Sequence, residues 1–372
     1  MSERPATDAA DPANMTCPAP IPERARVLLG HGSGGQLSAA LMRDVIGPAL
    51  AGYVAGSGRA AGNGATAGPA GPLNDAAIVD VAGIRLAFTT DSFVVSPLEF
   101  PGGDIGELAV NGTVNDLAMM GAQPLALSLA YVIEEGLPVE DLRRITESVA
   151  RAADRAGVRV VTGDTKVVGR GAADGLFVNT AGIGLVAEGV APAADRAGAG
   201  DIVILSGAIG LHGIAIMSVR EGLDIEVEIA SDTQPLNALV AAILAACPEV
   251  RVLRDPTRGG LASALNEIAA ASRVGIELNE DAIPIPGPVR AACEMLGLDP
   301  LHVANEGKLV AIVPAASAPA VIAAMRFLPE GADAVEIGAV VADHPAMVTM
   351  RTIVGSQRIV DMLVGEQLPR IC

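Results

Sequence analysis

Residues 101–122 read PGGDIGELAVNGTVNDLAMMGA and have the pattern of one helix. Asp104 is a typical residue at a helix start, and Gly121 is typical of a helix end. Just before this stretch, residues 75–95 contain two apolar runs around a turn at Val81–Gly83, which predicts a β-hairpin. Residues 124–133 predict a further strand. Strands on both sides of a helix indicate an α/β arrangement.

The alternation of strands and helices continues along the chain. Residues 138–157 predict an amphipathic helix with Leu142, Ile145 and Val149 on one face. Residues 158–168 predict a strand that runs into a loop, and 176–188 another strand. A second series starts near residue 199. We therefore expect an α/β (α+β) fold with two domains, 26–190 and 191–350. A disordered extension (1–25), a flexible Gly/Ala insertion (51–72) and a final strand with a mobile tail (351–372) complete the chain.

Composition excludes several classes of function. The 372 residues carry a formal net charge of -18, which disfavours binding to nucleic acid or to an anionic membrane surface. The N-terminus has no apolar segment typical of a secretory signal, and no apolar run is long enough to cross a bilayer. The four cysteines are scattered and form no CxxC pair. This pattern argues against a zinc site or disulfide framework and favours the cytoplasm.

Several aspartates follow apolar segments. Each stands where an apolar strand or helix is expected to meet a loop: Asp75, Asp91, Asp116 and Asp164. Oxygen ligands without histidine suit Mg²⁺, and Asp255 in the segment RDPTRGG is a candidate ligand for a second ion. For any single aspartate, capping of a helix or turn is the better interpretation. For the set of four, we favour magnesium.

Two glycine-rich loops follow apolar runs and precede expected helices. They are HGSGG, which contains Gly34 and Gly35, and SGAIGLHG, which contains Gly210 and His212. Such loops can present backbone N–H groups to an anion, although plain tight turns are the alternative. Neither loop fits the P-loop or Rossmann patterns. His212 is a candidate phosphate contact only, and Arg258 is another, at even odds with a structural turn.

Two polar positions fall on the helix expected in residues 101–122. Asn111 and Asn115 are four residues apart and therefore share one face. Asparagine is a poor helix former, so the pair suggests a contact with phosphate or metal-bound water. A buried, hydrogen-bonded structural pair is equally consistent with the pattern.

Lysine is rare in this chain. Of 25 basic residues only Lys166 and Lys308 are lysines, and a lysine, unlike an arginine, can lose its proton and act as a base. Lys166 and Glu306 would form an acid/base pair if the fold brings them together. The chain ends in PRIC, so Cys372 is expected to be exposed on the tail, and its thiol would need a positive neighbour to become reactive.

These motifs together resemble one known family. HGSGG, TTDSFVV, PGGDIGELAVNGTVNDLAMMGA, VTGDTKVV, RDPTRGGLA, NEGKL and the terminal PRIC are similar to the HypE family of hydrogenase maturation proteins. These are carbamoyl dehydratases related to aminoimidazole ribonucleotide synthetase and selenophosphate synthetase. The resemblance covers residues 27–372. It implies a two-domain PurM-like fold whose N-terminal sheets form a barrel in a homodimer, with ATP and Mg²⁺ between the domains.

The resemblance also implies a reaction. Cys372 would receive a carbamoyl group from HypF, and phosphorylation of its oxygen by ATP followed by loss of phosphate would leave a thiocyanate. The cyano group would pass to iron on a HypC–HypD complex, for NiFe hydrogenase. Glu306 or neutral Lys166 would serve as the base. The implied ATP and phosphate contacts are Gly34, Gly35, Asn111, Asn115, Thr165, Gly210, His212 and Arg258.

Two other functions stay open at this point. An ATP-dependent synthetase of the same superfamily could act on a small free substrate, but such an enzyme has no need of a terminal cysteine. A non-catalytic scaffold could deliver metal from the tail thiol, but the sequence places no second cysteine or histidine ligand near Cys372.

Overall fold

The structure is a computed structural model that describes residues 26–32, 34–50, 74–222, 229–363, 368 and 370–372. The predicted disordered extension and Gly/Ala insertion lie outside these residues, as do 364–367 and 369 of the tail. The mobility of the tail therefore stays a prediction. Within the described ranges, no helix is long and apolar enough to span a membrane.

The first half of the chain forms a five-stranded sheet in the order β1-β2-β7-β5-β6. Its strands are β1 (Ala77–Val81), β2 (Ile84–Phe93), β5 (Ala122–Glu134), β6 (Arg159–Val168) and β7 (Leu176–Val186). The predicted hairpin is confirmed: β1 and β2 pair antiparallel around Ala82 and Gly83, which both have positive φ. A strand that runs into a loop is expected within residues 158–168, and this is wrong, because β6 continues to Val168.

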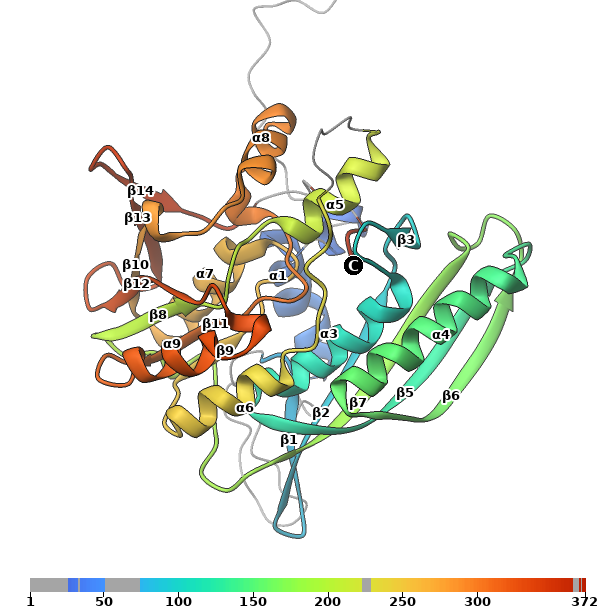
Figure 1. The fold of residues 1–372 in the computed structure, drawn as a ribbon, viewed down its shortest axis with the longest axis horizontal. Helices are drawn as coiled ribbons and strands as arrows, with labels where there is room; N and C mark the ends of the chain where they lie inside the picture. Colours follow the sequence, from blue (N-terminus) through green and yellow to red (C-terminus); the bar gives the residue numbers. More distant parts are fainter. Residues whose placement is uncertain (1–25, 33, 51–73, 223–228, 364–367, 369) are drawn as a thin grey trace, which may run out of the picture.

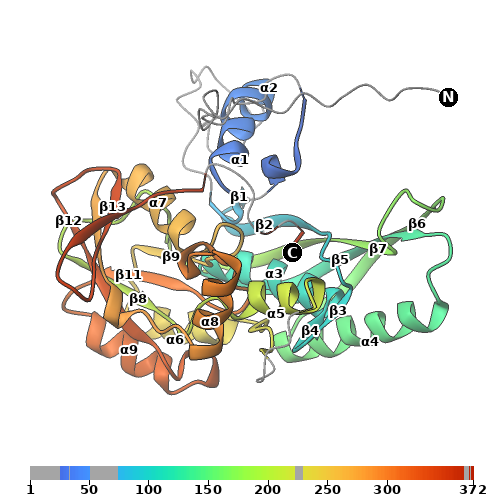
Figure 2. The same cartoon turned by 90° about the horizontal axis from the view of Figure 1, so that it is seen from above.

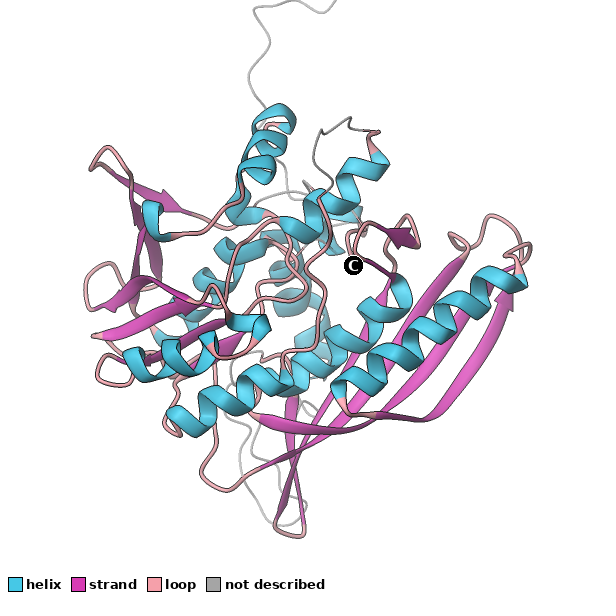
Figure 3. Ribbon diagram, in the orientation of Figure 1, coloured by secondary structure: helices cyan, strands magenta, loops and turns pink. Residues whose placement is uncertain are grey.

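Two helices cover one face of this sheet (Figures 1 and 2). Helix α3 (Ile105–Met119) begins where predicted, because the Asp104 side chain accepts hydrogen bonds from the N–H groups of Gly106 and Glu107. Helix α4 (Val139–Ala156) buries Ile145 and Val149, as its periodicity predicted. On the other side of the sheet, the short helices α1 (Gln36–Leu41) and α2 (Gly47–Leu50) lie near β1 and β2 (Figure 2), and Figure 3 shows the long helices α3 and α4 beside the strands.

The second half forms a seven-stranded sheet in the order β14-β13-β10-β12-β8-β11-β9. Its strands are β8 (Asp201–Leu205), β9 (Val252–Arg254), β10 (Gly275–Asn279), β11 (Val310–Pro314), β12 (Val335–Val341), β13 (Met347–Arg351) and β14 (Gln357–Val360). Helix α7 (Gly260–Ser272) packs on one face. Helices α6 (Asn237–Ala246) and α9 (Ala318–Arg326) pack on the other, over β8, β9 and β11.

Short elements connect and flank the two sheets. They are η2 (Leu29–Gly32), α1 (Gln36–Leu41), η3 (Met42–Ile46), α2 (Gly47–Leu50), β3 (Glu99–Phe100), β4 (Gly103–Asp104), α5 (Leu211–Arg220), η4 (Glu280–Ala282), α8 (Gly287–Leu296), η5 (Pro300–His302) and η6 (Pro329–Gly331). Helix α5 packs its Ile216 and Met217 against Phe93 and Phe100, so the second half reaches over the first.

The predicted α/β architecture with two sheets is therefore confirmed. Helix α6 of the second half contacts α3 and β5 of the first, which fixes the two sheets side by side. In the single chain the first sheet is open, with β1 and β6 at its edges, and forms no closed barrel among the described strands. The end of the chain lies between the two halves, near β2, α3 and α5 (Figures 1 and 2).

Candidate active site

A polar cavity of about 250 Å³ lies between the two halves. The first half contributes Asp75, Thr89, Thr90, Asp91, Gly112 and Asp116. The second half contributes Arg254, Asp255, Thr257, Arg258, Glu306 and Cys372. Four of the five aspartates predicted as metal ligands thus meet in one place, together with the terminal cysteine, Glu306 and Arg258.

Three of these carboxylates form a cluster. Asp75, Asp116 and Asp255 each offer one oxygen atom, and these atoms lie within 4.8 Å of one another. The sequence analysis placed Asp91 and Asp116 where elements meet loops, and this was wrong. Asp91 lies inside β2 and Asp116 inside α3. Both side chains line the cavity.

Burial and mutual repulsion make this cluster reluctant to ionise. The pKa of Asp116 is raised well above its usual value, first by burial and then by the charges of Asp255, Asp75 and Asp91. Burial, followed by the charge of Asp75, raises the pKa of Asp255 to about 8. The positive charge of Arg254 partly offsets this repulsion, because its guanidinium lies 2.9 Å from Asp75 and 2.5 Å from Glu267. A cation placed among the three carboxylates would relieve the remaining repulsion.

Cys372 is not the exposed terminal thiol that the sequence suggested. It is partly buried and packs against a core cluster that includes Phe93, Val95 and Ile371. Burial raises the pKa of its thiol, the nearby guanidinium of Arg258 lowers it, and the charges of Glu306 and Asp91 together with a hydrogen bond to Glu306 raise it. The thiol in this position is therefore held neutral, beside the positive neighbour that the sequence analysis required.

Hydrogen bonds hold the backbone of Glu306, while one of its carboxylate oxygens has no hydrogen-bond partner among the described residues. Its N–H donates to Asp232 Oδ1 at 3.1 Å, and its carbonyl accepts from Asn115 Nδ2 at 3.3 Å. Its pKa lies well above the usual value, mainly because of burial and then because of Asp255, Asp91 and Asp232. The buried Oε1 has no hydrogen-bond partner among the described residues. A buried polar atom without a partner is uncommon in folded proteins, so Oε1 is a candidate contact for a bound group.

The structure does not bring Lys166 to Glu306 within one chain, as the predicted acid/base pair required. The Lys166 ammonium bonds both carboxylate oxygens of Asp164, at 2.8 and 2.6 Å. Both side chains are exposed on the edge strand β6, as is Thr165, whose N–H donates to Asp164 Oδ1. Asp164 was predicted as a metal ligand, but it does not line the cavity because β6 is the strand farthest from β2.

The glycine loops serve packing more than anion binding. The Gly34 N–H donates to Ser38 Oγ at 2.9 Å, and a Cβ at Gly34 would lie 2.6 Å from the carbonyl oxygen of Arg258. A Cβ at Gly35 would lie 2.5 Å from the carbonyl oxygen of Leu363. The Gly210 N–H donates to Asn305 Oδ1 at 2.7 Å. None of the three glycines lines the cavity, and their role at phosphate stays a prediction.

The polar pair on α3 makes buried contacts between the two halves, but Asn111 Oδ1 has no hydrogen-bond partner among the described residues, so the choice between the two predicted roles stays open. Asn115 Oδ1 accepts from the N–H of Leu236, and its Nδ2 donates to the carbonyls of Gln234 and Glu306. Asn111 Nδ2 donates to Thr233 Oγ1 at 3.2 Å. Both side chains are fully buried between the halves and do not line the cavity.

His212 contacts the end of the chain, and its contact with phosphate stays a prediction. Its Nε2 lies 2.9 Å from the carbonyl oxygen of Ile371, and its Nδ1 lies 2.7 Å from Ser231 Oγ. Complete burial lowers its pKa, so the ring is neutral near pH 7. One ring nitrogen donates to the Ile371 carbonyl and the other accepts from the Ser231 hydroxyl.

Five residues of the cavity wall were not predicted from the sequence: Thr89, Thr90, Gly112, Arg254 and Thr257. Thr89 Oγ1 donates to Asp116 Oδ2 at 2.8 Å, Thr90 stands beside it, and Arg254 pairs with Asp75. The signal for Arg254 was its position directly before Asp255 in RDPTRGG. The two threonines precede Asp91 in TTDSFVV, where strand propensity alone explains them.

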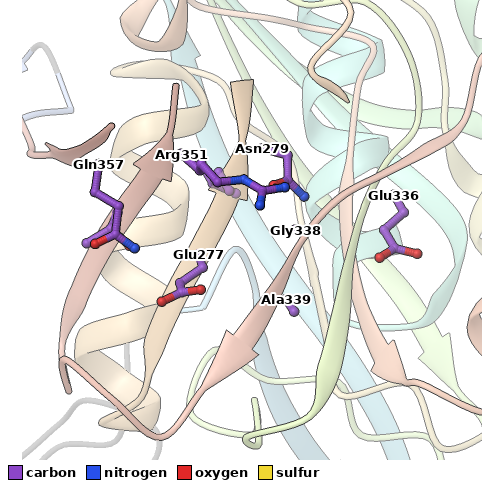
Figure 4. Close-up of a pocket in the computed structure, with 9 residues that line it drawn as sticks. Glu277, Asn279, Glu336, Gly338, Ala339, Arg351 and Gln357 are labelled. Carbon is purple, nitrogen blue, oxygen red and sulfur yellow. The ribbon is translucent and has the colours of Figure 1, made fainter. Parts of the chain in front are cut away.

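A second polar hollow of about 250 Å³ lies on the face of β10, β12, β13 and β14 that no described helix covers. Figure 4 shows the side chains of Glu277, Asn279, Glu336, Arg351 and Gln357 around it. The guanidinium of Arg351 donates to Asn279 Oδ1. None of the predicted site residues lies there, so the cavity at Cys372 is the candidate site.

Comparison with known proteins agrees with this assignment. Residues 73–186 match the family described as AIR synthase related protein, N-terminal domain, and 198–350 match its C-terminal domain. The carbamoyl dehydratase HypE of Azotobacter vinelandii is 58% identical over 299 residues, which cover 80% of this chain and 88% of that protein.

Solved structures give the same result. The crystal structure of a HypE–HypF complex is similar with a TM-score of 0.78 and 46% identity, over 87% of this chain and 100% of that one. HypE in complex with ATP gives a TM-score of 0.75 and 44% identity, over 93% of this chain and 100% of that one. The chain therefore belongs to the HypE family of carbamoyl dehydratases, within the AIR synthase related proteins.

Proposed function

We propose that the protein dehydrates a carbamoyl group carried on its own Cys372 to a thiocyanate, with consumption of ATP. The observation that carries the proposal is the meeting of the terminal thiol, the partnerless Glu306 Oε1, Arg258 and a carboxylate cluster in one cavity. A small-substrate synthetase gains no support from this arrangement, because the chain's own terminus fills part of the site.

The reaction has two steps, phosphorylation of the carboxamide oxygen and elimination of phosphate. The carboxamide oxygen on Cys372 takes the terminal phosphoryl group of ATP, which converts it into a good leaving group. The carbon–oxygen bond then breaks, phosphate leaves, and the nitrogen loses both protons as the C≡N bond forms. Glu306 Oε1 is free to accept a proton, and Arg258 faces Cys372, Asp91 and Glu306, where it can neutralise negative charge.

The donor set fits magnesium. Asp75, Asp116 and Asp255 supply only carboxylate oxygens, with Asp91 beside them, and the raised pKa values of Asp116 and Asp255 show unrelieved repulsion. These three residues would hold the ion. When bound, Mg²⁺ would supply positive charge to phosphate oxygens in the cavity.

The partners and the compartment follow from the same proposal. A solved HypE–HypF complex supports HypF as the donor of the carbamoyl group. We propose a HypC–HypD complex as the acceptor of the cyano group, for the iron of NiFe hydrogenase. Three described cysteines, Cys247, Cys293 and Cys372, are free thiols, which supports a cytoplasmic location.

We further propose a homodimer that closes the first sheet into a barrel. This sheet exposes Phe88 (48%), Leu125 (41%), Ile183 (40%) and Leu185 (41%), and a second copy would bury them. Strand β6 forms an edge of this sheet, so the dimer is also where Asp164, Thr165 and Lys166 of a second copy would act in the reaction. Light scattering should give twice the mass of one chain. The mass of a single chain at micromolar concentration would contradict the dimer.

The dehydration itself is tested by the mass of the C-terminal peptide. We expect incubation with HypF, carbamoyl phosphate and ATP to add a carbamoyl group at Cys372, and the adduct to lose the mass of one water only when Mg²⁺ is present. Cys372→Ala is the control and should stay unmodified. An unmodified Cys372 with continued ATP consumption would return the chain to the small-substrate synthetases.

A further inference from the structure

We propose that Arg220 and Asp174 are positioning residues that hold the last three residues of the chain at the depth where Cys372 meets Glu306. This inference rests on the proposed function, since it concerns how the tethered substrate reaches the cavity. Neither residue lines the cavity, and neither was a candidate from the sequence.

The terminal residues pair with the segment that follows β2. The Val94 N–H donates to an oxygen of Cys372 at 3.2 Å, and the Ser96 N–H donates to the Arg370 carbonyl at 3.4 Å. These two bonds hold the tail against residues 94–96 at two points. They do not form a regular strand pair, because Arg370 has a positive φ.

Arg220 joins the two segments of this pairing. Its Nη2 donates to the carbonyl oxygens of both Ser96 and Arg370, the latter at 2.8 Å, and its Nε donates to Ser96 at 3.1 Å. A planar guanidinium can make these bonds together, and an ammonium cannot reproduce that geometry. The backbone oxygens of all three terminal residues thus accept hydrogen bonds. Arg220 donates to Arg370, His212 to Ile371 and the Val94 N–H to Cys372.

Asp174 holds the side chain of Arg370. The Arg370 guanidinium forms an ion pair with the Asp174 carboxylate and donates to the Val94 carbonyl at 3.2 and 3.1 Å. The two partners of the ion pair keep 30% and 45% of their side-chain surface exposed. A water-accessible pair of this kind exchanges readily, which suits a tail that must leave to collect a carbamoyl group and to deliver a cyano group. Docking raises the effective concentration of the carboxamide at the cavity.

The first test measures docking without any catalysis. Iodoacetamide labelling of Cys372 in the unmodified protein is followed by the mass of the C-terminal peptide. Arg220→Ala and Asp174→Asn should label several-fold faster than wild type, since the partly buried thiol spends more time outside the cavity. Arg170→Ala is the matched control: Arg170 lies in the same 169–175 loop, beside Glu134 and Gly136 and not beside the described tail residues, so its labelling should equal wild type.

The second test measures dehydration in a single turnover, starting from carbamoylated protein. We expect conversion to slow several-fold for Asp174→Asn, which weakens an exposed ion pair, and about tenfold or more for Arg220→Ala, which removes charge-assisted hydrogen bonds to the docked tail. The ATP concentration for half-maximal rate should not change. Asp174→Glu should restore much of the rate, whereas Arg220→Lys should not.

The outcomes separate the two proposals. Labelling and dehydration equal to Arg170→Ala in both variants would overturn the positioning role and leave the proposed function intact. Wild-type protein that acquires a carbamoyl group but never loses water would defeat the proposed function, while the labelling rates would still report whether Arg220 and Asp174 hold the tail.

Discussion

Replacing Glu306 with glutamine is expected to slow the dehydration of carbamoylated Cys372 by about 10²- to 10⁴-fold, the range that a positioned general base contributes. Glutamine keeps the size of the side chain but cannot accept a proton. Carbamoylation by HypF should continue, because that step takes place before the tail is docked. The measurement is single-turnover conversion, followed by the loss of one water from the C-terminal peptide.

The pH profile adds a second signature. Glu306 acts as a base only when ionised, and burial holds its pKa well above the usual value. The rate should therefore rise with pH through that raised pKa and level off above it, and Glu306→Gln should lose this dependence. Glu336→Gln is the matched control, because Glu336 lies in the second hollow (Figure 4) and should leave the rate unchanged. A variant Glu306→Gln that converts as fast as wild type would remove Glu306 from the reaction.

Replacing Asp255 with asparagine is expected to have two effects of opposite sign. The first is weaker use of Mg²⁺: the concentration needed for half-maximal dehydration should rise about tenfold or more, because one of three clustered carboxylates is lost. This is measured by titrating Mg²⁺ at saturating ATP.

The second effect is a more stable metal-free protein. The pKa of Asp255 is raised to about 8 in the folded state, so its contribution to stability is present at low pH and is lost as pH rises toward that value. Asparagine does not ionise, so the variant keeps the stability that wild type loses when Asp255 ionises. At pH 8 without metal, the variant should therefore melt about 2 °C or more above wild type. Asp343→Asn, at an exposed position, is the control and should change neither quantity. A metal-free variant that melts below wild type would contradict the repulsion described for this cluster.

Much of the fold was predictable because the local signals agree. Asp104 and Gly121 mark the limits of α3 as predicted, and the spacing of Ile145 and Val149 gives the buried face of α4. The error at residues 158–168 has a clear cause. Glycine and aspartate at 163 and 164 suggest a loop, but pairing with β5 keeps them in the strand, and a Cβ at Gly163 would lie 2.1 Å from the carbonyl oxygen of Leu129.

The candidate site was predictable only in part. Asp75, Asp91, Asp116, Asp255, Arg258, Glu306 and Cys372 were named from the sequence and line one cavity. The glycine loops, the asparagine pair and His212 were candidates for phosphate; in the structure they make packing and backbone contacts, and their role at phosphate stays a prediction. A motif shows which residue types stand together in the chain, but their polar atoms can equally well hold the fold together.

The sequence by itself determined the residue types of the chemistry: a terminal thiol, a set of carboxylates, and two lysines among many arginines. It also determined the two-domain α/β architecture, because hydrophobic periodicity and capping are local properties of the chain. Only the tertiary structure decided which groups meet. Lys166 lies on a strand edge beside Asp164, whereas Cys372 reaches Glu306 and Arg258 because Arg220, Asp174 and His212 hold the tail from distant segments. Such long-range contacts depend on how the two sheets pack, and no local pattern in the sequence encodes that packing.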